Sequence, residues 1–109
     1  MESLAAAAAC AAYLMNTQPV LPDAYVEMKP LPQTCIEAGD MDGDCRGVFT
    51  RQKSGRTIVT AIDHFGVLVH ESCHVILDAL GQPQDEAVCY EIQDRAGECF
   101  RGMGALEID

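Results

Sequence analysis

The sequence has little positive charge, no tryptophan, and no apolar run long enough to cross a membrane. Its longest unbroken apolar run, residues 4–15, is about 12 residues long, whereas a transmembrane helix needs about 20. Seven lysines and arginines stand against seventeen acidic residues, which gives a formal net charge of −10. Because such a surface repels phosphate groups, we also exclude a general nucleic-acid-binding function.

The six cysteines are many for a chain of 109 residues, yet no two of them form a CxxC pair. Cys35 and Cys45 flank a polar loop and are the best-placed local disulfide in an oxidising compartment, which the cysteine content would suit. Cys10, Cys73 and Cys89 lie in apolar contexts, where we expect free buried thiols that pack as small hydrophobic groups.

The N-terminal segment SLAAAAACAAYLM is apolar and rich in alanine, as both signal peptides and stable helices can be. It lacks the positive region that begins a signal peptide, and Glu2 supplies the opposite charge. We therefore interpret residues 3–16 as a structural helix with Ser3 as its N-cap. The localisation stays open.

The rest of the chain alternates between strand and helix patterns, which predicts an α+β fold. The expected strands are 25–29, 47–51 and 56–62, and the expected helices are 63–80 and 84–100, with one or two helical turns at 33–38. The second and third strands should form a hairpin through the turn QKSG. Asp63 is the expected N-cap of the first of these helices, and Gly81 its terminator. The tail from Gly102 onward should be loose.

The string HESCH at residues 70–74 carries the most chemical information. Histidines four residues apart project from one face of a helix, so His70 and His74 can reach the same tetrahedral zinc ion. Glu71 would lie beside that ion, where it can accept a proton from a metal-activated water. Asp78 continues the histidine stripe by one turn and could orient a ligand. Hydrogen-bonded core histidines and a closed structural zinc site are the alternatives.

A third metal ligand has to come from outside this string. The metzincin pattern would place glycine three and histidine six residues after His74, and both positions hold leucine, so that class is excluded. A glutamate from a following helix is another common source. Glu86 ranks first, because Tyr90 shares its helical face, while Asp85 and Glu91 remain alternatives.

The strings HESCH and DEAVCYEIQ together resemble the gluzincin branch of the zincin metallopeptidases, especially small peptidases of the form HExxH…EAxxYxxQ. The resemblance covers roughly residues 47–95. It implies that His70, His74 and Glu86 bind zinc and that Glu71 is the general base. It also implies that the strand before the active-site helix, at 57–61, borders the cleft and pairs with an extended peptide substrate.

We therefore expect a single compact zincin-like α+β domain over residues 1–109, with an N-terminal helix at 1–16 and a metal-binding core at 47–100. The expected function is a zinc-dependent, peptidase-like hydrolase that acts on a peptide or protein, with Zn²⁺ as cofactor. Tyr90 would stabilise the oxyanion or form a hydrogen bond near the ligand helix. A non-catalytic, zinc-stabilised module that binds a partner along a strand edge is the alternative. A disulfide-stapled scaffold without metal is a third interpretation, and the oligomeric state is left open.

Overall fold

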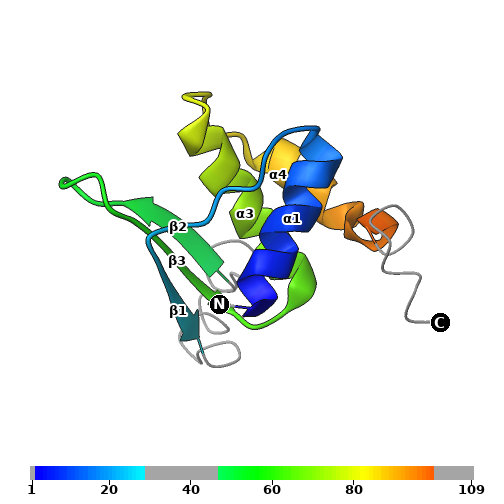
Figure 1. Cartoon of the computed structure of the whole chain (residues 1–109), viewed down its shortest axis with the longest axis horizontal. Helices are drawn as coiled ribbons and strands as arrows, with labels where there is room; N and C mark the ends of the chain where they lie inside the picture. Colours follow the sequence, from blue (N-terminus) through cyan, green and yellow to red (C-terminus); the bar gives the residue numbers. More distant parts are fainter. Residues whose placement is uncertain (1, 29–46, 100–109) are drawn as a thin grey trace.

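The computed structural model describes residues 2–28 and 47–99, which form three α-helices beside a three-stranded sheet (Figure 1). The helices are α1 (Glu2–Met15), α3 (Phe65–Ala79) and α4 (Glu86–Asp94), the strands are β1 (Ala24–Met28), β2 (Gly47–Arg51) and β3 (Thr57–Ile62), and a 3₁₀ turn, η2 (Ala96–Glu98), follows α4. This arrangement confirms the α+β class. The expected turns at 33–38, the expected Cys35–Cys45 disulfide and the expected loose tail lie outside the described residues.

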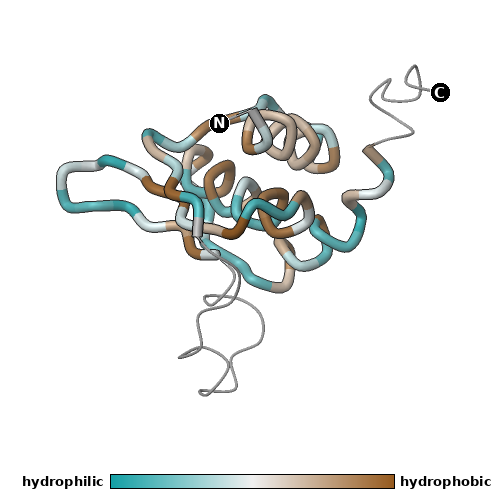
Figure 2. Tube along the Cα trace, turned by 90° about the horizontal axis from the view of Figure 1, so that it is seen from below, coloured by the Kyte–Doolittle hydropathy of each residue, from teal (hydrophilic) through white to brown (hydrophobic). Residues whose placement is uncertain are grey.

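The sheet has the strand order β1-β3-β2 and mixed pairing. β1 runs parallel to β3, whereas β2 and β3 form the predicted antiparallel hairpin, in which Gly47 is opposite Ala61 and Arg51 is opposite Thr57. β3 is therefore the central strand, and its residues Val59 and Ala61 are fully buried. The tip of the hairpin projects from the body of the molecule and is hydrophilic (Figure 2).

The hydrophobic core lies where α1 and the sheet pack against α3. Every residue of α3 from Val67 to Leu77 is buried, so this helix is the centre of the fold. The small side chains of α1 let the two helices approach closely, and its residues Leu4, Ala7 and Ala11 are fully buried. Because α1 already begins at Glu2, Ser3 lies inside the helix and is not its N-cap. In the described part of the chain, no helix is both long and apolar enough to span a membrane.

The N-terminal end of α3 differs from the predicted one, and the C-terminal end agrees with it. His64, not Asp63, is the N-cap, because its Nδ1 accepts a hydrogen bond from the backbone N–H of Val67 at 3.3 Å. At the other end Gly81 terminates the helix as predicted. It has a φ of +70°, and the backbone N–H of the following residue donates to the Leu77 carbonyl at 2.9 Å.

The helix predicted at 84–100 is shorter in the structure, where α4 ends at Asp94 and is followed by the 3₁₀ turn. The expectation of free thiols is wrong, because the helices bring all four described cysteines together in pairs. Cys10 of α1 is bonded to Cys99, and Cys73 of α3 is bonded to Cys89 of α4. Two disulfides fit an oxidising compartment.

The two disulfides should contribute unequally to stability, because they close loops of very different length. Cys10–Cys99 spans 89 residues of sequence and Cys73–Cys89 spans 16. The chain-entropy model gives about 4.5 and about 3 kcal/mol for loops of these lengths. We therefore expect Cys10→Ala/Cys99→Ala to unfold at lower urea concentration than Cys73→Ala/Cys89→Ala. Equal losses of stability in the two variants, or a larger loss in Cys73→Ala/Cys89→Ala, would contradict this expectation.

Candidate metal centre

Two buried histidines on α3 face the same side of the helix, one turn apart. His70 is 3% exposed and His74 is 7% exposed. Their Nε2 atoms lie 3.2 Å apart, so both imidazoles are directed at one point, as the four-residue spacing predicts.

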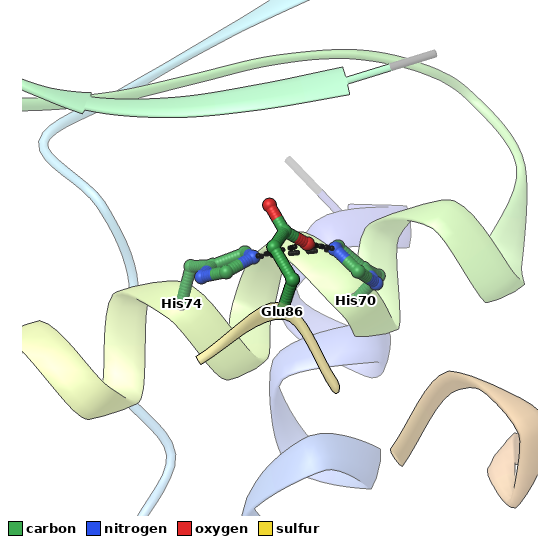
Figure 3. A group of neighbouring side chains, drawn as sticks. All are labelled: His70, His74 and Glu86. Carbon is green, nitrogen blue, oxygen red and sulfur yellow. Dashed lines mark hydrogen bonds and ion pairs between the residues drawn. The ribbon is translucent and has the colours of Figure 1, made fainter. Parts of the chain in front are cut away.

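The third side chain at this point is Glu86, the first residue of α4. Its Oε1 lies 2.8 Å from His70 Nε2 and 3.2 Å from His74 Nε2. Figure 3 shows the carboxylate reaching from the start of α4 toward the space between the two rings. The Glu86 side chain is 58% exposed, so the group is open to solvent on this side.

The structure selects Glu86 over the two other carboxylates that the sequence offered. Asp85 is the N-cap of α4, and its carboxylate accepts hydrogen bonds from the backbone N–H groups of Ala87 and Val88 at 3.0 and 3.3 Å. Glu91 is exposed and lines a separate hollow between α1 and α4. Only Glu86 joins the two histidines in a group of ligand atoms among the described residues.

The donor atoms of His70, His74 and Glu86 could hold a metal ion. Ligands about 2.0–2.1 Å from a tetrahedral zinc ion lie about 3.3 Å from one another. The three observed separations, 2.8, 3.2 and 3.2 Å, are slightly shorter, so a small outward movement of the carboxylate would admit an ion. Two imidazole nitrogens and one carboxylate oxygen are also a donor set that suits zinc.

The environment shifts the pKa values of two of these side chains toward their metal-binding forms. Burial and the neighbouring His74 lower the pKa of His70, although Glu86 and Gln93 act in the opposite direction. Burial alone would raise the pKa of Glu86, but the two histidines outweigh it and the pKa lies below its usual value. Both shifts favour the neutral imidazole and the ionised carboxylate, which are the forms that bind a cation.

A pocket of about 190 Å³ lies beside this group, and the predicted base Glu71 is part of its wall. The lining residues come from β2, α3 and the segment that leads into α4: Gly47, Val48, Phe49, Glu71, His74, Gln84 and Glu86. Glu71 is only 3% exposed. The structure therefore brings the predicted base and two of the three predicted ligands into one pocket.

Gly47 allows β2 to pass close to the Glu71 carboxylate. A Cβ atom at this position would lie 3.1 Å from Glu71 Oε2 and 2.9 Å from the Cβ of Ala61. Contacts this short would force either the strand or the carboxylate to move. The sequence does not indicate this role, because a glycine at the start of a strand does not reveal which side chain lies opposite.

The strand that borders the pocket is β2, which corrects the expectation for residues 57–61. β3 is hydrogen-bonded to β1 on one side and to β2 on the other, so its edges are not available to a substrate. Within the described residues, β2 pairs with β3 alone. The expectation was wrong because β3 inserts between the other two strands, and the order of strands along the chain does not predict this.

Tyr90 packs against the ring of His70. The two ring centroids are 4.5 Å apart and the rings are tilted by 58°. Tyr90 is partly buried at this contact, and the pocket wall described above is made by other residues. Tyr90 is therefore observed in contact with the His70 ring, and its role as an oxyanion donor stays a prediction.

Asp78 does not orient a histidine, in contrast to the expectation. Its carboxylate forms an ion pair with Arg51, whose Nε lies 3.1 Å from each Asp78 oxygen, and the Arg51 Nη2 also contacts it. Arg51 also donates from Nη1 to the Gly55 carbonyl at 2.9 Å. Asp78 therefore connects the end of β2 to the last turn of α3.

Gln84, which no pattern in the sequence indicates, contacts the His74 ring at Nδ1. Its Oε1 lies 2.7 Å from Nδ1 of His74, and its Nε2 donates to the backbone carbonyl of His74 at 3.0 Å. Gln84 was expected to begin the helix predicted at 84–100, but it lies in the connection between α3 and α4. The turn at Gly81 redirects the chain and places Gln84 next to His74.

The interpretation of this site depends on the geometry of the chain itself. The described residues bring His70, His74 and Glu86 within hydrogen-bonding distance of one another and place Glu71 in the wall of the adjacent pocket. No protein-family model, curated protein or solved structure gives a significant match to the chain.

Proposed function

We propose that this protein is a zinc-dependent, peptidase-like hydrolase whose metal ion is held by His70, His74 and Glu86. The observation that carries the proposal is the convergence of three donor atoms, no pair more than 3.2 Å apart, at the edge of a pocket whose wall contains Glu71. The resemblance of HESCH and EAVCYEIQ to the gluzincin pattern supports the same roles for these residues.

The hydrogen bonding of His74 supports a cation at this point. Its Nδ1 faces the amide oxygen of Gln84, which can only accept a hydrogen bond, so the ring carries its proton on Nδ1. In the neutral ring, Nε2 then presents a lone pair to the Glu86 carboxylate, 3.2 Å away. Two acceptors at this distance repel each other unless a donor or a cation lies between them. A divalent cation bound by both atoms would remove that repulsion.

A zinc ion in this site would act as a Lewis acid that activates a water molecule and polarises a carbonyl group. Glu71 is the base. Its carboxylate accepts a proton from the attacking water and delivers it to the leaving amine nitrogen, as the C–O bond forms and the peptide C–N bond breaks. The near burial of Glu71, beside Gly47, keeps the carboxylate directed at the pocket.

The strand β2 makes a peptide the best-fitting class of substrate. Its residues Gly47, Val48 and Phe49 line the pocket next to His74 and Glu86. An edge strand can add an extended peptide through backbone hydrogen bonds, which would place a peptide bond beside the metal ligands and Glu71. A zinc-stabilised module that binds such a segment without cleaving it would use the same surface. A substitution of Glu71 distinguishes the two functions, because only cleavage requires a base.

The assignment of the third ligand predicts a selective effect on metal affinity. Glu86→Gln removes the anionic ligand and should weaken zinc binding on the order of 100-fold. Glu91→Gln makes the same chemical change on the same helix, at an exposed position away from the histidines, and should leave the affinity unchanged. Competition titration against a chromogenic chelator measures both. An equal effect of the two variants would exclude Glu86 as a ligand.

The role of Glu71 predicts that metal binding and turnover separate. Glu71→Gln should retain one zinc ion per chain and lose about 10²- to 10⁴-fold in kcat. Cleavage of a quenched-fluorescent peptide library, with zinc content measured in parallel, tests this expectation, and Glu91→Gln again serves as the control. Full activity in Glu71→Gln would remove Glu71 from the mechanism. A zinc-loaded wild-type protein that binds these peptides but cleaves none would favour the non-catalytic module.

A further inference from the structure

We propose that Gln84 is a positioning residue that fixes His74 in the tautomer whose Nε2 can bind a metal ion. The importance of this tautomer for metal binding rests on the proposed function. The assignment of the tautomer itself depends only on hydrogen bonds within the chain.

The two hydrogen bonds of Gln84 determine the orientation of its amide. The backbone carbonyl of His74 can only accept a hydrogen bond, so the amide end that faces it at 3.0 Å must be the NH₂ group. The oxygen of the amide is then the end that faces Nδ1 of His74 at 2.7 Å. A rotated amide would set its oxygen against the carbonyl oxygen, which is repulsive.

The orientation of the amide in turn determines the proton position on His74. An amide oxygen can only accept, so Nδ1 must carry the proton. In the neutral ring, the lone pair then lies on Nε2, which is the atom directed at His70 and Glu86. Without Gln84 the proton could move to Nε2, and that nitrogen would no longer be a metal ligand.

Gln84 also connects the two helices that supply the ligands. It lies in the segment between the C-cap of α3 at Leu80 and the N-cap of α4 at Asp85, two residues before Glu86. Because it bonds both the ring and the backbone of His74, it holds the start of α4 against α3. The same contact therefore orients one ligand and places another.

The uncharged amide of Gln84 accepts the hydrogen bond from Nδ1 without placing a negative charge beside the His74 ring. A carboxylate at the same position would also accept from Nδ1, and it would make the ring a stronger ligand. It would lose the donor to the His74 carbonyl. Gln84→Glu should therefore preserve the tautomer, whereas Gln84→Leu removes the acceptor altogether.

The test measures the tautomer in the metal-free protein and the zinc affinity in the same set of variants. Long-range ¹H–¹⁵N correlation spectra at pH 8 should show His74 protonated on Nδ1 in wild-type protein and in Gln84→Glu. In Gln84→Leu, a substantial fraction should be protonated on Nε2. Gln82→Leu, on the same connection and exposed, is the matched control and should behave as wild type. Zinc affinity should fall about 10- to 100-fold in Gln84→Leu alone.

The outcomes separate this inference from the proposed function. An Nε2–H tautomer in wild-type protein, or an unchanged tautomer in Gln84→Leu, would overturn the inference whether or not zinc binds. Equal zinc affinity in wild type and Gln84→Leu would leave the metal site standing and remove the positioning role. If the tautomer shifts as expected but wild-type protein binds no zinc, the proposed function fails and the hydrogen-bonding role of Gln84 stands. Should Gln84→Leu lose its fold, Gln84→Glu and the wild-type spectrum still test the tautomer.

Discussion

The contact between α3 and α4 is the interaction on which the candidate site depends. α3 supplies two imidazoles, but only α4 supplies the carboxylate that lies between them. The nine residues of α4 bury just Cys89 and Ile92, so apolar packing alone holds this helix weakly. The Cys73–Cys89 disulfide joins the residue before His74 to a residue one turn after Glu86. The covalent bond therefore restricts the positions that the Glu86 carboxylate can occupy relative to the two histidines.

A second constraint places Glu71 at the same pocket as the edge of β2 that is unpaired among the described residues. Burial of a carboxylate is costly unless it faces polar groups or a cation, and Glu71 is nearly inaccessible between α3 and β2. Gly47 leaves room for this carboxylate, and the ion pair of Arg51 with Asp78 holds the other end of β2 onto α3. One end of β2 thus passes close to Glu71 of α3, and the other end is joined to Asp78 of the same helix. The arrangement places Glu71, His74, Glu86 and β2 around one pocket.

The sequence predicted the parts of the site that follow from helical periodicity and little beyond them. The spacing of His70 and His74, the hairpin and the end of α3 depend on residues close in sequence, and the structure agrees with each. It also brings Glu86 next to the two histidines. The strand order and the disulfides depend on contacts between distant segments, for which the sequence carries no periodic pattern. The role expected of Asp78 was wrong and the contact of Gln84 with His74 was not predicted, for the same reason. Arg51 of the hairpin forms an ion pair with Asp78, and the turn after α3 brings Gln84 next to His74.

The coordination shell of the metal-loaded protein tests the central claim most directly. Zinc K-edge X-ray absorption of the protein loaded with one equivalent of zinc should give nitrogen and oxygen ligands at about 2.0–2.1 Å, with the multiple scattering of two imidazoles and no sulfur. Sulfur ligands at about 2.3 Å, or a shell with fewer than two imidazoles, would contradict a centre built from His70, His74 and Glu86.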